Sequence, residues 1–189
     1  IRVSFNHNGT FNVFDKETGK DYNNLGYFKD SGEIGNPWQH VAPEVDETFT
    51  TLGEQANVTL LRHGEFETTF KITMRWELPE KRAFDEKSRS EHKLPVDIES
   101  LVTLRKGAKF VEIETTINNR CEDHYLQVAF PTNIKAEYAD AQGQFDVVRR
   151  PIKAPDYSLY DEPPMTEHPM NSFVSISDGE NGVALLNTG

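Results

Sequence analysis

Carboxylates and histidines are the side chains of this chain best suited to chemistry. The sequence contains 31 Asp and Glu residues and six histidines. Two carboxyl groups about 5 Å apart, or about 6.5–9.5 Å apart, can together cleave a glycosidic bond. With so many acidic residues, some pairs reach those separations by chance. The sequence therefore nominates no catalytic pair.

Motifs for metal ions and nucleophiles give no stronger signal. No two histidines follow the spacing HxH or HxxxH, and the single cysteine, Cys121, has no cluster of further ligands beside it. Structural zinc sites need about four such ligands. No serine lies in a GxSxG motif, and the glycine-rich residues 30–35 lack the lysine of a phosphate-binding loop. We therefore predict no metal site in this chain.

Loop aromatics and one histidine are the remaining binding candidates. His168 lies in a proline-rich stretch not far from Tyr157 and Tyr160, and Trp38 follows a glycine-rich stretch. An aromatic ring can stack on the face of a sugar. The alternative interpretation is that these rings cover the edges of sheets.

The elements that must position these residues are strands. Residues 66–78 alternate between apolar and polar side chains, which sends one set to each face of a strand. Asn8-Gly9 and Lys106-Gly107 mark turns between such runs. Further strands are expected at residues 2–6, 10–15, 49–52, 57–62, 96–104, 110–117, 126–130, 145–148, 173–176 and 183–186. The pattern predicts an all-β fold, a large antiparallel β-sandwich formed by residues 1–189.

Three stretches are expected to be loops. Residues 27–45 are rich in Gly, Pro, Asn and Asp, which break strands. Residues 80–94 form a run of mixed acidic and basic side chains, as a solvated loop does. Residues 151–171 contain five prolines and little apolar pattern, and connections of this length are often functional or disordered.

Composition limits the partners and the location. The net charge of −11 argues against nucleic acid and against anionic membranes, and no apolar run approaches the length of a membrane span. One cysteine and the lack of a signal peptide favour the cytoplasm. Because the chain begins with Ile1 and residues 183–186 read as a strand just starting, we expect a truncated piece of a longer protein.

Several segments in collinear order resemble glycoside hydrolase family 38, the α-mannosidases. Among the most telling are Asn118-Asn119-Arg120, Ala129-Phe130-Pro131-Thr132 and His168-Pro169-Met170-Asn171. Each motif alone is unspecific, but their order and spacing together are fairly specific. The segments that carry the resemblance are residues 9–20, 27–35, 110–120, 126–132, 144–151 and 168–173.

The resemblance implies a position within a larger enzyme. Family members carry a zinc-dependent catalytic barrel, then a helical bundle, then β domains of the galactose-mutarotase-like supersandwich kind. This chain resembles the start of that β region, so the nucleophile, the acid/base residue and the zinc ligands are expected outside it. The implied partners are the parent's own catalytic barrel and a mannose-containing glycan or mannoside. The reaction would be retaining hydrolysis of an α-mannosidic bond.

The resemblance also suggests which residues face the substrate. The β region of the family closes one side of the pocket, so the loops at residues 30–38 and 157–173 are expected there. The substrate-facing candidates are then His168, Asp30, Glu33, Trp38, Tyr157 and Tyr160.

Two other functions stay open beside the non-catalytic domain of an α-mannosidase. An independent carbohydrate-binding module would need exposed loop aromatics. An aldose mutarotase-like enzyme would need a His and a carboxylate paired in a groove. A surface left bare by excision would show as an exposed apolar patch or as a homo-oligomer.

Overall fold

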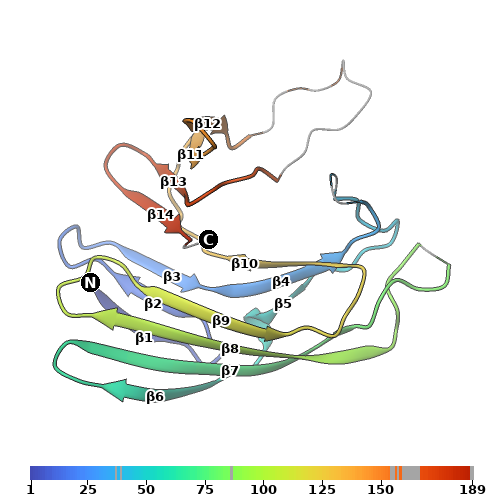
Figure 1. The fold of residues 1–189 in the computed structure, drawn as a ribbon, viewed down its shortest axis with the longest axis horizontal. Helices are drawn as coiled ribbons and strands as arrows, with labels where there is room; N and C mark the ends of the chain where they lie inside the picture. The colour runs from blue at the N-terminus through green and yellow to red at the C-terminus, as the bar shows by residue number, and fades with distance from the viewer. Residues whose placement is uncertain are drawn as a thin grey trace. The chain divides into compact units, whose positions relative to one another are not determined.

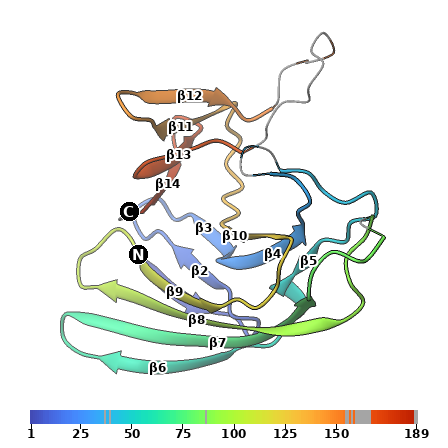
Figure 2. The same cartoon turned by 45° about the vertical axis from the view of Figure 1, so that its right-hand side comes forward.

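The chain folds into two compact units, residues 1–131 and residues 132–189. The computed structural model describes residues 1–36, 38, 40–85, 87–153, 156, 158 and 167–187. Every strand pair within the described residues is antiparallel. The strands of each unit are drawn in Figures 1 and 2.

The first unit contains one large sheet and two smaller ones. The large sheet has the order β6-β7-β8-β9, with β6 (Asn57–His63), β7 (Glu67–Pro79), β8 (Lys93–Arg105) and β9 (Glu112–Asn118). A second sheet contains β1 (Arg2–Phe5), β2 (Phe11–Phe14) and β3 (Asp21–Leu25). The third has the order β10-β4-β5, with β4 (Tyr27–Gly32), β5 (Phe49–Thr50) and β10 (His124–Ala129), and a 3-10 turn at Thr51–Gly53 follows β5.

The core of this unit follows from the alternation along its two longest strands. β7 and β8 pair over 13 residues, from Glu67 opposite Arg105 to Pro79 opposite Lys93. Their inward side chains are almost fully buried, at 2% exposure for Trp76 and 0% for Leu78 and Val96. Burying such apolar surface supplies most of the free energy of folding. The buried core cluster comprises Phe28, Met74, Trp76, Leu78, Val96, Ile98 and Cys121.

The smaller sheets pack against the inner face of the large sheet. Phe5 of β1 and Phe70 of β7 have ring centroids 4.6 Å apart, and Phe28 of β4 belongs to the core cluster. The turn between β1 and β2 comes close to the core at Gly9, whose φ is +83°. A Cβ there would lie 2.8 Å from Met74 Cε, so this left-handed turn also lacks room for a side chain.

The second unit is a single sheet of order β12-β11-β13-β14. Its strands are β11 (Tyr138–Gln142), β12 (Val147–Pro151), β13 (Phe173–Ser177) and β14 (Gly182–Leu186). Among its described residues, Ala141 is the only apolar side chain that is fully buried.

The predicted all-β antiparallel sandwich is confirmed, but some loop assignments were wrong. Residues 27–32 form β4 rather than a loop, because they pair with β10 along their whole length. The charged loop ends at residue 92, because β8 begins at Lys93, and Arg82 and Arg89 form an isolated β-bridge within it. Strands β3 and β11 were not predicted. Among the described residues no helix is long and apolar enough to span a membrane.

Candidate functional site

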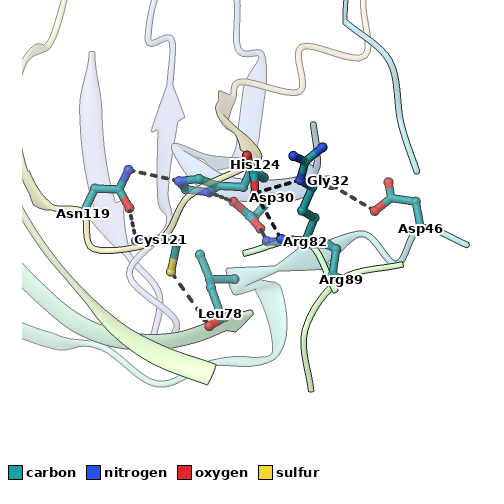
Figure 3. Close-up of polar contacts among 10 residues, drawn as sticks. Asp30, Gly32, Asp46, Leu78, Arg82, Arg89, Asn119, Cys121 and His124 are labelled. Carbon is teal, nitrogen blue, oxygen red and sulfur yellow. Dashed lines mark hydrogen bonds and ion pairs between the residues drawn. The ribbon is translucent and has the colours of Figure 1, made fainter. Parts of the chain in front are cut away.

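A buried cluster of ionisable side chains lies at one end of the first unit (Figure 3). The pleat of β4 places Asp30 there, since residues two apart point to the same face and Phe28 is in the core. Its neighbour β10 pairs Leu126 with Asp30 and His124 with Gly32. His124 therefore points to the same interior face, two residues before the apolar Leu126.

Asp30 is the centre of the cluster and is completely buried. One carboxylate oxygen, Oδ2, lies 2.5 Å from His124 Nδ1, and the other, Oδ1, lies 2.5 Å from Arg89 Nη2. The side chains of Arg89 and His124 are only 5% and 6% exposed. A buried carboxylate is tolerated only when opposite charge or hydrogen bonds compensate the lost hydration, and both partners supply that here.

Asn119 fixes the protonation of the histidine. The backbone N–H of Cys121 donates to Asn119 Oδ1 at 3.0 Å, so the amide nitrogen of Asn119 faces His124 Nε2 at 2.9 Å. An amide nitrogen can only donate, so Nε2 must accept and carries no proton. The hydrogen-bond network thus assigns the proton to Nδ1, which donates to Asp30. His124 is neutral in this arrangement, and the charges of Asp30 and Arg89 balance.

Arg89 is held by charge and by an aromatic ring. Its guanidinium carbon lies 5.5 Å from the centroid of the Phe49 ring, a distance at which a cation is attracted to the ring face. Among the described residues, Arg89 Nε and Nη1 are buried without a hydrogen-bond partner. Arg89 was predicted to lie in a solvated loop, and that prediction was wrong. The ion pair with Asp30 draws this one side chain of the loop into the interior.

Three backbone segments meet around the cluster and are tied together. The N–H of Glu33 donates to the carbonyl of Asp123 at 2.9 Å, and that of Val45 donates to the carbonyl of Lys87 at 2.8 Å. Asp46 Oδ1 accepts from the N–H of Gly32 at 2.9 Å. The segments after β4, before β8 and before β10 therefore form one hydrogen-bonded end of the sandwich. The buried cluster lies beneath them.

Glu33 organises the first of these segments. Its carboxylate accepts from the backbone N–H of Gly35 at 2.6 Å and of Val41 at 3.1 Å, and it pairs with the ring of His40. The ring of His40 in turn lies 4.6 Å, centroid to centroid, from that of Tyr125. Burial raises the pKa of Glu33, but the hydrogen bonds from His40, Val41 and Gly35 outweigh it and lower this pKa overall.

Cys121 lies beside the cluster but is not an activated nucleophile. Its thiol lies in the core and contacts the carbonyl of Leu78 at 3.8 Å. Burial raises the pKa of the thiol above its ordinary value, and the negative charge of Asp30 adds to this effect. The thiolate is the reactive form, so Cys121 stays a neutral, unreactive thiol near neutral pH.

The cluster contains the two residues of a His–carboxylate dyad, but a substrate cannot reach them. A His–carboxylate pair acts as a base through the ring nitrogen that faces away from the carboxylate. Here that nitrogen, His124 Nε2, is occupied by Asn119. The three charged or titratable side chains are at least 94% buried. The arrangement can fasten segments together, and it leaves no atom free to receive a proton from a substrate.

The structure separates the residues that the sequence singled out. Asp30 is buried in β4, so its placement on an open loop was wrong, and Glu33 follows it in the segment described above. Trp38 is 79% exposed, and its backbone N–H donates to Asn36 Oδ1 at 2.9 Å. His168 is an exposed residue of the second unit. Tyr157 and Tyr160 lie outside the described residues.

Sequence reasoning missed Arg89, His124 and Asn119 as members of the cluster. Phe28 and Asp30 are two residues apart, as are His124 and Leu126, so each pair shares one face of a strand. This spacing was the available signal for Asp30 and His124. Nothing in the sequence pointed to Arg89. Among the described residues there is no group of three or more His, Cys, Asp or Glu side chains that could hold a metal ion.

Comparison with protein families gives a match over the whole chain. Residues 1–189 match the Glycosyl hydrolases family 38 C-terminal domain. The chain belongs to glycosyl hydrolase family 38. The resemblance seen in the sequence is thereby confirmed.

Individual proteins are similar to this chain in sequence and structure. An alpha-mannosidase from Enterococcus faecalis V583 superposes with a TM-score of 0.88 at 31% identity, over 98% of this chain and 22% of that one. A second family 38 protein from Enterococcus faecalis gives a TM-score of 0.84 at 29% identity, over 98% and 23%. A protein of Halalkalibacterium halodurans, provisionally named a mannosylglycerate hydrolase, is 26% identical over the whole of this chain. The chain spans 22% of the length of that curated relative.

Proposed function

We propose that this chain is a non-catalytic β-sandwich domain of a retaining, zinc-dependent α-mannosidase, and that it supports the catalytic barrel. The observation that carries the proposal is the match of the entire chain to the C-terminal domain of family 38. The alpha-mannosidase of Enterococcus faecalis has the same fold in a chain of which this one covers 22%.

The geometry of the buried cluster favours a supporting role. An enzyme keeps its acid or base within reach of the substrate, usually in a cleft. Here the Asp30–His124 pair is enclosed, and Asn119 occupies the outer ring nitrogen. The third function considered above, a mutarotase-like enzyme, would need such a pair in an open groove. The enclosed pair instead stabilises the loops that we propose to face the rest of the enzyme.

The chemistry of the parent enzyme is proposed to lie in its catalytic domain. When bound there, zinc would help to hold and polarise the sugar next to the carboxylates that cleave the bond. We transfer no zinc ligand and no catalytic carboxylate of the family to this chain, because no residue here matches those motifs. The contribution of these residues is to hold loops in place beside that site.

Some of those loops are proposed to reach the substrate pocket. The candidates are Glu33, Trp38 and His168, and also Tyr157 and Tyr160, which lie outside the described residues. Trp38 and His168 are exposed, so a neighbouring domain or a sugar can contact them. Asp30 is not proposed again, because its carboxylate is sealed in the interior.

Activity measurements on two polypeptides test the supporting role. The purified 189-residue chain should not cleave an aryl α-mannoside, whereas the full-length parent should. Cleavage by the chain alone, in a preparation shown to be free of other glycosidases, would contradict the proposal. Loss of cleavage on deleting residues 1–189 from the parent shows only that the domain is needed. The isolated chain is therefore the decisive sample.

His168 provides the test of pocket contact. The substitution His168→Ala in the full-length parent should lower kcat/KM for an α-mannoside and leave the melting temperature unchanged. His63→Ala is a matched control, because His63 is an exposed histidine on β6 of the first unit. Kinetics equal to those of the wild type would remove His168 from the pocket.

One observation favours a second function, an independent carbohydrate-binding module. Trp38 exposes 79% of its surface, as a ring that stacks on a sugar must do in the free protein. In that case the 189-residue chain should bind a mannose-containing glycan in calorimetry, and Trp38→Ala should abolish binding. An absence of binding by the wild-type chain would dismiss this function.

A further inference from the structure

The sheet of the second unit has one almost entirely apolar face. In the registers of β12-β11-β13-β14, Ala141 lies opposite both Val148 and Val174, and Ile176 lies opposite Val183. Directly opposed residues share a face of the sheet. We define the apolar face by the side chains on that side, which are Ala139, Ala141, Val148, Arg150, Val174, Ile176, Val183 and Leu185.

The opposite face carries nearly all the polar side chains of the sheet. Asp140 and Arg149 form an ion pair across β11 and β12, with Nε 2.8 Å from Oδ1. Gln142, Ser175 and Ser177 lie on the same side. Tyr138, Val147, Phe173 and Leu186 also lie on that side, so the opposite face is mixed, whereas the apolar face has one charged residue among eight. The face that lacks polar side chains is the one expected to be covered.

Within this chain the apolar face is only partly covered. Val148 and Leu185 remain 38% and 37% exposed, and Ala141 is the one member that is fully buried. The inward side chains of the large sheet in the first unit are quite different, since Trp76, Leu78 and Val96 are at most 2% exposed. A small sheet needs a packed apolar face for stability, so a further surface must cover this one.

Arg150 indicates what that surface contains. It is the single charged residue of the apolar face, and no described residue forms an ion pair with it, whereas its neighbour Arg149 pairs with Asp140. Covering a guanidinium with apolar groups alone is costly unless a carboxylate meets it. The covering surface is therefore expected to be apolar with an acidic side chain opposite Arg150.

A second copy of the chain does not meet this requirement. The apolar face contains no Asp or Glu, so two such faces brought together would bury two arginines without a carboxylate. The net charge of −11 further opposes self-association. By contrast, the matched relatives have most of their length outside the region aligned to this chain, which spans 22% of them.

We propose that the apolar face of β12-β11-β13-β14 is an interdomain contact of the parent enzyme. Its occupant is an apolar surface of the parent polypeptide, outside residues 1–189, that presents a carboxylate to Arg150. This inference rests on the proposed function, in which the chain is one domain of a longer family 38 enzyme. It adds which face of the domain is covered and by what chemistry.

Side-chain footprinting by a photoactivated carbene, read by mass spectrometry, tests the contact without relying on activity. Val148 and Leu185 should be labelled in the 189-residue chain and should lose most of that label in the full-length parent. Val147 and Leu186 lie on the opposite face and should be labelled in both. Leu78 and Val96, buried in the first unit, should stay unlabelled and so show that the samples are folded.

Three outcomes would overturn the proposal. Equal labelling of Val148 and Leu185 in both polypeptides would mean that the face stays open. Protection in the 189-residue chain that grows with its concentration would identify a second copy as the occupant. Protection in that chain at every concentration would mean that the chain covers the face itself. If the parent proves inactive on α-mannosides while the protection is seen, the proposed function fails but the contact stands.

A charge reversal tests the carboxylate separately. In the full-length parent, Arg150→Glu should restore the labelling of Val148 and Leu185, because a carboxylate would then oppose a carboxylate. Arg149→Glu is the matched control on the opposite face and should leave the labelling low. Labelling of Val148 and Leu185 in Arg150→Glu that stays as low as in the wild-type parent would show that no acidic group faces Arg150.

Discussion

The two compact units of this chain bury their apolar side chains to different extents. The first unit encloses a core in which Trp76, Leu78 and Val96 lose nearly all contact with solvent. The second unit has one face on which seven of eight side chains are apolar, but that face keeps Val148 and Leu185 more than one-third exposed. Alternation therefore specifies which face is to be buried. It does not specify whether the same chain supplies the cover.

The difference extends to ionisable groups. In the first unit, Asp30 and Arg89 are buried together and balance each other, with His124 completing the cluster. In the second unit, Arg150 lies on the apolar face without an ion pair among the described residues. The charges of this buried cluster are therefore paired within the first unit. The second is expected to depend on a carboxylate supplied from elsewhere.

The largest effect is expected from removing the cation of the buried cluster. Arg89→Met leaves the Asp30 carboxylate buried without its counter-charge, and breaking a buried ion pair in this way typically costs about 3–5 kcal/mol. Urea unfolding followed by tryptophan fluorescence measures the free energy of unfolding of the first unit, because both tryptophans lie in it.

A matched exposed pair serves as the control for Arg89. Arg75 and Asp97 lie 3.8 Å apart on the surface, with side chains 66% and 46% exposed. Arg75→Met should change the free energy of unfolding by only about 0–1 kcal/mol, as for surface ion pairs in general. Equal losses in the free energy of unfolding for Arg89→Met and Arg75→Met would show that the buried ion pair stabilises the fold no more than the exposed pair does.

A truncation in each sheet tests the contrast in packing directly. Leu78→Ala opens a cavity in a closed core and should cost about 2–5 kcal/mol. Val174→Ala, on the partly covered apolar face, should cost less than about 1 kcal/mol in the 189-residue chain. Amide exchange of β7 and β13 measures the two losses separately. A loss at Val174 as large as that at Leu78 would mean that the second unit has a core of its own.

The reaction rate of one cysteine thiol in each unit compares how well the two units exclude solvent. Burial raises the pKa of Cys121, and each unit of increase lowers the fraction of thiolate at pH 7 about tenfold. Cys121 should therefore react slowly with a disulfide reagent. A cysteine introduced by Val148→Cys, with Cys121→Ala as background, should react many times faster. Similar rates at the two positions would place Val148 in a covered site within this chain.

The smallest effect is expected from the pH dependence of Glu33. The pKa of this carboxyl group is lower in the folded state than its ordinary value of 4.5, so its contribution is full above that value. The stability is lost as the pH falls through the folded pKa. The difference in free energy of unfolding between wild type and Glu33→Gln should shrink from pH 7 to pH 3. A difference that is constant over this range would show that Glu33 does not stabilise as an anion.

The strands that the sequence predicted well are those with strict alternation. Residues 66–78 and 96–104 were recognised because a period of two over many residues has no helical alternative, and they became β7 and β8. β4 was missed because Lys29, Asp30, Ser31 and Gly32 look like a loop when read alone. β10 pairs with it along its length and provides the hydrogen bonds that make it a strand.

The candidate site likewise depends on partners that the sequence alone did not reveal. Asp30 was singled out, but for an open loop, and Arg89 was assigned to solvent with the other charges of residues 80–94. Their partnership joins positions far apart in the sequence and depends on a loop that folds back over the end of the sandwich. The positions of Trp38 and His168 on the surface agree with the sequence, but their predicted contact with substrate stays a prediction.

The sequence by itself determined the class of fold and the family, because alternation and collinear motifs are properties of the chain alone. It did not determine the apolar face of the second unit, because β11, which supplies Ala139 and Ala141, was not predicted. Only the tertiary structure decided which charges are buried, because burial depends on what folds over a residue. It brought Asp30, Arg89 and His124 together and capped the histidine with Asn119. It also showed that one unit closes its core while the other leaves an apolar face partly open.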